Sequence, residues 1–140
     1  MGSTTPAMKH TIDDILMPLA ITVIIDAKVR DPEKQAFAEQ ARGLLDLFGY
    51  TDIEADGIKE WYKAHEADLS EKLKGKRRNT TVLRALSRFE KDIYVENLYE
   101  AMIAISVSDK EYVAEESELM KSAAAIWGFR KPPIKVDNSA

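Results

Sequence analysis

The stretch TIDDILMPLAITVIID, residues 11–26, decides the fold of this chain. Its centre, residues 15–25, is apolar on nearly every side, and acidic residues stand at both ends. Thr11, followed closely by two aspartates, is typical of a helix N-terminus, where a hydroxyl caps backbone amides and carboxylates suit the helix dipole. A helix without a polar face must be covered by other elements. The sequence therefore predicts a central, buried helix.

Further start and stop residues divide the chain beyond this helix. Asp31 and Pro32 predict an N-cap and a first helical position, and Gly49 predicts the end of that second helix. Thr51 and Glu54 form a capping-box pattern, which predicts the start of a third helix. Apolar residues at helical spacing follow each start, whereas the alternation typical of strands is scarce.

The remaining helices are bounded in the same way. Gly75 predicts the end of the third helix, Asn79 or Thr80 the cap of the fourth, and Gly128 the end of the last. The sequence thus predicts an all-α fold, a compact single-domain bundle of about six or seven helices. The predicted organisation is a flexible tail over residues 1–9, a helical domain over residues 10–129 and a flexible tail over residues 130–140.

The composition narrows the classes of function. The 140 residues suffice for one domain with a real core, since 45% are hydrophobic and 31% charged. A net charge of −4 argues against nucleic acid as a partner. The chain has no cysteine, which excludes disulfides, thiolate metal sites and cysteine nucleophiles. Any metal is therefore expected on oxygen or imidazole ligands.

Targeting and catalytic signatures are missing from the sequence. The apolar runs are too short to cross a bilayer, and no stretch has the pattern of a signal peptide, so we expect a soluble, cytoplasmic protein without a membrane span. No glycine-rich phosphate loop, nucleophile elbow or metal-binding histidine pair occurs. The sequence therefore predicts neither enzymatic activity nor an organic cofactor.

Two segments of the chain follow the same pattern. An apolar helix ends at Asp26 and another at Asp109, and a glutamate follows each aspartate after seven residues, Glu33 and Glu116. Each of the helices that follow ends in an aromatic residue and a glycine. The sequence predicts a repeated unit of helix, acidic loop and helix, related by a pseudo-two-fold axis.

This pattern resembles the TerB-like family, which comprises tellurite-resistance TerB proteins and the amino-terminal domain of DnaJ-type membrane co-chaperones. The resemblance rests on an Asp-x-x-Val-x-x-x-Glu motif at residues 26–33 and on the second Asp-to-Glu loop, and it covers residues 11–129. Family loops carry Gly after the Asp, where this chain has Ala27 and Lys110. The resemblance implies an all-helical fold, clustered acidic residues that bind a metal ion, and a role in bacterial stress responses such as tellurite resistance.

The acidic loops have two explanations. Carboxylates bind hard cations, so the loops predict a divalent-cation site that favours Ca²⁺ or Mg²⁺. Carboxylates in first helical turns also serve as structural caps, which makes a helical protein–protein interaction module the alternative function. The candidate metal ligands are Asp26, Asp31, Glu33, Asp109, Glu115 and Glu116.

A basic segment forms the other charged feature. It predicts a weak surface for a polyanion or an acidic partner, with a solvated helix end as the alternative. Arg84 and Arg88 continue the run on one helix face and are expected to pair with glutamates. No aromatic residue is interleaved with the run, so base stacking is not expected. The segment comprises Lys72, Lys74, Lys76, Arg77 and Arg78.

The histidines and large aromatic residues are interpreted as structural. His65 lies on the apolar stripe of the third helix and is expected to be a half-buried, hydrogen-bonded core residue rather than a metal ligand. His10, the first residue after the predicted tail boundary, is counted with the N-terminal tail and given no role. A protein partner and a homodimer both stay open. The expected packing anchors are Trp61, Trp127, Phe48 and Phe89.

Overall fold

The computed structural model describes residues 10–25, 31–89, 94–108 and 114–129. These residues form six α-helices and no strand, which confirms the all-α prediction. No helix among them is long and apolar enough to cross a membrane. Both predicted tails, and the two loop aspartates Asp26 and Asp109, lie outside the described residues. The helices are α1 (Ile12–Ile24), α2 (Asp31–Leu47), α3 (Ala55–Lys74), α4 (Arg78–Leu86), α5 (Val95–Ser106) and α6 (Ala114–Trp127).

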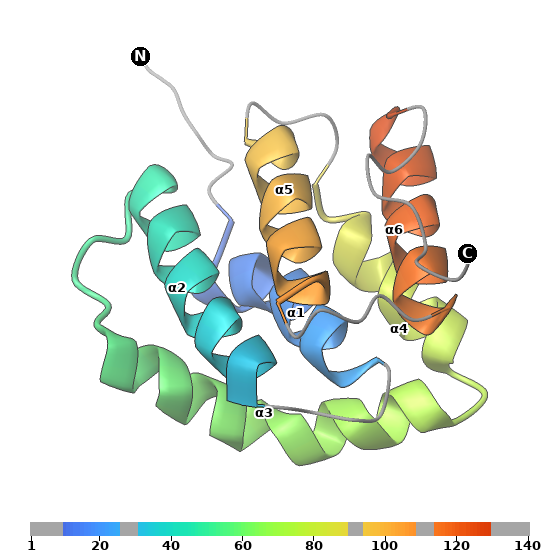
Figure 1. Ribbon diagram of the computed structural model, residues 1–140, viewed down its shortest axis with the longest axis horizontal. Coiled ribbons are helices and arrows are strands. Elements are labelled where there is room, and N and C mark those ends of the chain that lie inside the picture. The colour runs from blue at the N-terminus through green and yellow to red at the C-terminus, as the bar shows by residue number, and fades with distance from the viewer. Residues whose placement is uncertain (1–9, 26–30, 90–93, 109–113, 130–140) are drawn as a thin grey trace.

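Helix α1 is the centre of the bundle (Figure 1). It packs against α2, α3, α4 and α5, and its residues from Ile15 to Ile24 are buried except for the partly exposed Met17. Its N-terminus is a complete capping box: the Thr11 hydroxyl accepts the Asp14 amide at 3.0 Å, and the Asp14 carboxylate accepts the Thr11 amide at 3.2 Å. The predicted central helix and its cap are both confirmed.

Glycines end the helices as predicted. Gly49 and Gly128 have φ angles of 94° and 86°, a backbone conformation that side chains disfavour and that closes a helix. Gly75 follows the last residue of α3. The second helix begins at Asp31 itself, which is therefore its first helical residue rather than its N-cap. Such one-residue differences are usual at helix ends.

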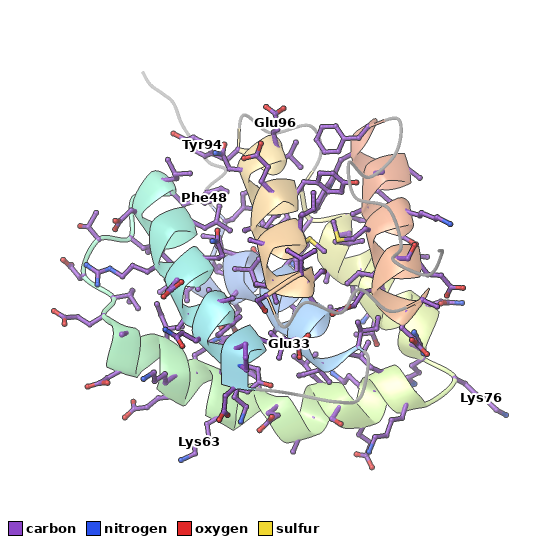
Figure 2. All side chains as sticks on the ribbon, in the orientation of Figure 1. Glu33, Phe48, Lys63, Lys76, Tyr94 and Glu96 are labelled. Carbon is purple, nitrogen blue, oxygen red and sulfur yellow. The ribbon has the colours of Figure 1, made fainter. Side chains whose placement is uncertain are left out.

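Two predicted helix starts are wrong. Helix α3 begins at Ala55 behind an uncapped Glu54, because Ile53 packs against the core from the non-helical segment and delays the helix. Helix α4 begins at Arg78, before the predicted caps. There the Arg78 amide donates to the Gly75 carbonyl at 3.2 Å, so the turn itself starts the helix. Figure 2 shows Lys76 at this turn, pointing away from the molecule.

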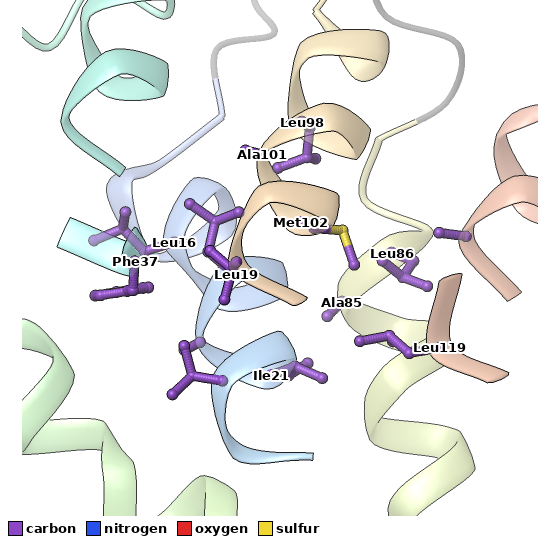
Figure 3. Close-up of a cluster of buried hydrophobic side chains, with 14 of the residues drawn as sticks. Leu16, Leu19, Ile21, Phe37, Ala85, Leu86, Leu98, Ala101, Met102 and Leu119 are labelled. Carbon is purple, nitrogen blue, oxygen red and sulfur yellow. The ribbon is translucent and has the colours of Figure 1, made fainter. Parts of the chain in front are cut away.

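The core lies where α1, α4 and α5 meet, with α2 and α6 closing its sides (Figure 3). Leu16 and Leu19 of α1, Leu86 of α4, and Leu98 and Met102 of α5 have no exposed surface. Burying a side chain of this size contributes roughly 1.5–3 kcal/mol. This shared core fixes the directions in which α1 and α5 end, and therefore the positions of the two helix junctions.

The two helix–loop–helix units have different surroundings. Helices α1 and α5 pack against each other at the centre, as the predicted repeat requires. Helix α2, however, packs against α1, α3 and α5, whereas α6 packs against α5 and α4. The long α3 lies across the base of α1 and α2 in Figure 1, and among the described helices it contacts α2 but makes no comparable contact with α6. The units therefore resemble each other in sequence more closely than in their contacts.

Candidate functional site

The last turns of α1 and α5 and the first turns of α2 and α6 lie at the same end of the bundle (Figure 1), and we call these pairs of helix ends the two junctions. Ile25, which follows α1, lines a surface hollow together with Glu115, Glu118 and Leu119 from the start of α6. Helix α2 begins at this end of the bundle and packs against α1 and α5. The fold therefore brings the first turns of α2 and α6, which carry the predicted ligands Asp31, Glu33, Glu115 and Glu116, to one end of the molecule.

Burial separates the predicted carboxylates into two kinds. The side chains of Glu33 and Glu116 have an exposed fraction of 0%, although both lie in the first turn of a helix. Asp31 and Glu115 are exposed, as expected for carboxylates that act only through the helix dipole. The structure thus singles out one glutamate in each junction.

The buried glutamates share a sequence signal that helix-start rules overlook. Glu33 stands four residues before Phe37, the first apolar residue on the inner face of α2. Glu116 stands three and four residues before Leu119 and Met120, which begin the inner face of α6. Positions three and four apart lie on one side of a helix. Each carboxylate is therefore carried on the core-facing stripe.

Buried polar groups gather at these junctions. The hydroxyls of Thr22 and Ser106 each donate to the carbonyl four residues earlier in their own helix, at 2.8 and 2.9 Å. They lie near the ends of α1 and α5, beside the loops that lead to the buried glutamates. Within the described ranges, the buried polar or charged side chains are Thr22, Glu33, Ser106, Glu116 and Ser117.

Tyr62 of α3 has a pKa that responds to the charge of Glu33 in the first junction. Its hydroxyl donates to the Glu66 carboxylate at 3.0 Å. Burial, then the hydrogen bond and charge of Glu66, and then the charge of Glu33 raise the pKa of Tyr62 well above its ordinary value of 10.0. The charge of Glu33 therefore contributes, as the smallest of these causes, to the raised pKa of Tyr62 on α3.

The described residues do not complete a metal site by themselves. Within residues 10–25, 31–89, 94–108 and 114–129, no three acidic or histidine side chains are grouped closely enough to hold a metal ion. The predicted ligands Asp26 and Asp109 belong to the loops outside these ranges. The structure therefore supplies two buried carboxylates at one end of the bundle, and the remaining ligands stay a prediction.

The basic segment is exposed along most of its length. Lys72 pairs with Asp68 at 3.1 Å, one turn earlier on α3, and Arg78 is partly buried in the hollow beside α6. Arg88 pairs with Asp14 at 3.4 Å rather than with the expected glutamate. A groove of about 570 Å³ lies between α3 and α4, and we call it the basic groove. The cations that line it are Lys72, Arg77, Arg84 and Arg88.

One histidine behaves as predicted and the other does not. His65 is partly buried, its Nδ1 lies 2.8 Å from the Trp61 carbonyl, and its ring stacks on Trp61 at 4.1 Å. His10 is not a tail residue: its ring packs 4.2 Å from that of Phe89, and its carbonyl accepts the Tyr50 hydroxyl at 2.6 Å. The folded domain includes His10 because these aromatic contacts cover the start of α1.

The comparisons with known proteins leave the family open. The likeness to the TerB-like family rests on short loop motifs, and two of its loop positions already depart from the usual glycine. It stays a prediction. No family model, curated protein or solved structure matches this chain.

Proposed function

We propose that this protein is a non-enzymatic divalent-cation-binding protein and that Glu33 and Glu116 hold the ion. The full burial of these two carboxylates, one in each junction, is the observation that carries the proposal. A buried carboxylate attracts a positive charge more strongly than an exposed one does, because the protein interior screens charge less than water. A hard cation such as Ca²⁺ or Mg²⁺ provides that charge and prefers carboxylate oxygens.

The arrangement of the helices that carry the two glutamates also supports the proposal. Both junctions lie at one end of the bundle, and α1 and α5, which lead into them, pack against each other. The predicted loop ligands Asp26 and Asp109 precede the buried glutamates by seven residues in both units. The cellular role implied by the family resemblance, a bacterial stress response such as tellurite resistance, remains part of this proposal.

Thermal unfolding of the full chain tests the proposal. Melting temperatures are measured with EDTA and then with Ca²⁺, Mg²⁺ or Zn²⁺, and binding heats are recorded by calorimetry. An ion at a hundred times its dissociation constant stabilises the fold by about 2.7 kcal/mol. We expect this shift in the parent protein and its loss in Glu33→Gln and in Glu116→Gln. Glu118→Gln, an exposed change on the same helix as Glu116, is the control and should keep the shift.

Two results would contradict cation binding. One is the absence of heat and of any melting shift at millimolar metal; the other is an equal shift in the parent and in both buried variants. Either result would favour the interaction module with structural acidic residues. That alternative draws on Leu83, which is 49% exposed in the hollow between α4 and α6.

A further inference from the structure

We propose that the basic groove binds a small molecule carrying two or more phosphate groups. The groove is open to solvent between α3 and α4, and Met17 of α1 contributes to its floor. Its volume of about 570 Å³ falls within the range of roughly 300–1,000 Å³ that is typical of small-ligand sites. This inference is independent of the cation proposed at the acidic junctions, because the two sites share no residue.

The charge of the groove is one-sided. Among the described residues, four cations and one carboxylate, that of Asp68, line the groove, although the whole chain has a net charge of −4. Lys72 is already paired with Asp68, and Arg88 with Asp14. Arg77 and Arg84 form no ion pair with any residue in the described part of the chain. Two guanidinium groups, each able to hold a phosphate through two hydrogen bonds, therefore remain for a ligand.

The spacing of these arginines indicates more than one anionic group. Arg77 is the N-cap residue of α4, Thr81 and Arg84 lie within the helix, and Arg88 follows its end; all four line the groove. Arg77 and Arg84 are two turns apart, or about 10 Å along the helix axis. Thr80 also lines the groove, so that two hydroxyl donors lie between the arginines. A chain of linked phosphates fits this row better than a single phosphate does.

The walls of the groove favour a compact ligand over a nucleic acid. The imidazole of His65 is the one ring that lines it, and one face of that ring is already stacked on Trp61. Single-stranded nucleic acids are usually held by aromatic rings that stack on successive bases. The groove offers charge and hydroxyl donors without such a platform. It therefore suits the phosphate groups themselves.

Calorimetry with inorganic tripolyphosphate as the probe tests this proposal on the full chain. EDTA is present throughout, so that no metal–phosphate complex contributes. The double variant Arg77→Gln/Arg84→Gln should bind at least about tenfold more weakly, since each lost charged hydrogen bond has an effect of this order. Arg42→Gln removes an equally exposed arginine from α2, outside the groove, and should bind like the parent. Equal melting temperatures of all variants would show that the fold is intact.

Several results would overturn the proposal. They are the absence of binding at millimolar tripolyphosphate, unchanged affinity in the double variant, and an equal loss in Arg42→Gln. Orthophosphate binding as tightly as tripolyphosphate would contradict the need for linked phosphates. A single-stranded RNA that binds more tightly than tripolyphosphate would make the groove a nucleic-acid site instead. Glu33→Gln should leave tripolyphosphate binding unchanged, which separates this test from that of the cation.

Discussion

The acidic junctions and the basic groove hold their charges in opposite ways. At the junctions, Glu33 and Glu116 are completely buried in the first turns of their helices. In the basic groove, the side chains of Arg77 and Arg84 are exposed to solvent. In both regions, the helix face that carries a charge decides the surroundings of that charge. What differs is whether that face meets the core or the solvent.

This difference separates two kinds of energetic role. A buried charge is coupled to the whole fold, because its loss or reversal changes the interior around it. An exposed charge contributes little to stability and remains available to a ligand. We therefore expect changes at the junctions to alter the free energy of unfolding, and changes in the groove to alter binding.

The largest effect on the free energy of unfolding is expected when the charge of a buried glutamate is reversed. The same change at its exposed neighbour is the comparison. Glu116→Lys should reduce the free energy of unfolding by about 3–5 kcal/mol, because the long cationic side chain enters a fully buried position. Glu115→Lys, one residue earlier and exposed, should change it by less than about 1 kcal/mol. Urea unfolding monitored by circular dichroism measures both. Similar losses in the two variants would mean that burial does not distinguish the neighbours.

A smaller effect concerns the pH dependence near the first junction. Burial and the charges of Glu66 and Glu33 raise the pKa of Tyr62 above 10.0, so the folded protein keeps this proton while the unfolded chain loses it. The free energy of unfolding should therefore fall as the pH rises above about 10, with Tyr62 contributing up to about 1.4 kcal/mol per pH unit.

The variant Tyr62→Phe isolates this contribution. It should show a shallower decline of stability than the parent when urea unfolding is compared at about pH 9 and about pH 11. The comparison uses the slopes, because the variant also lacks the hydrogen bond to Glu66. Equal slopes would contradict a raised pKa for Tyr62.

The smallest effect lies within the groove. Arg88→Gln should cost about 0.5–1 kcal/mol of unfolding free energy, since Arg88 pairs with the half-buried Asp14 of the α1 capping box. Arg84→Gln should cost less than about 0.5 kcal/mol, because Arg84 has no such pair among the described residues. High salt should reduce the difference. A loss above 1 kcal/mol for Arg84→Gln would give that arginine a structural role and weaken the contrast with the junctions.

Local rules predicted much of the fold because they act over a few residues. The capping box at Thr11 and the glycine ends at Gly49 and Gly128 each need only one turn of chain. The same rules were wrong at Thr51 and at Asn79, where a core contact and a backbone turn started the helices elsewhere. His10 was misplaced for a related reason, since its aromatic partners come from distant parts of the chain.

For the candidate sites too, the sequence predicted the local features, and the packing of distant helices decided the rest. The sequence identified the acidic residues and the basic run, and their chemistry follows from residue type alone. It treated Glu115 and Glu116 alike, although adjacent residues on a helix point about 100° apart and only one of them meets the core. It also treated the five cations between residues 72 and 78 as one surface, of which only Lys72 and Arg77 line the basic groove.

By itself, the sequence of this protein determined that it folds into helices, where most of them end, and which faces carry carboxylates or cations. These properties depend on backbone preference and on periodicity, which neighbouring residues settle among themselves. The tertiary structure alone decided that the two junctions lie at one end, that Glu33 and Glu116 are buried, and that α3 and α4 enclose a basic groove. Burial and enclosure depend on helices that are far apart in the chain, and packing against a common core brings them together.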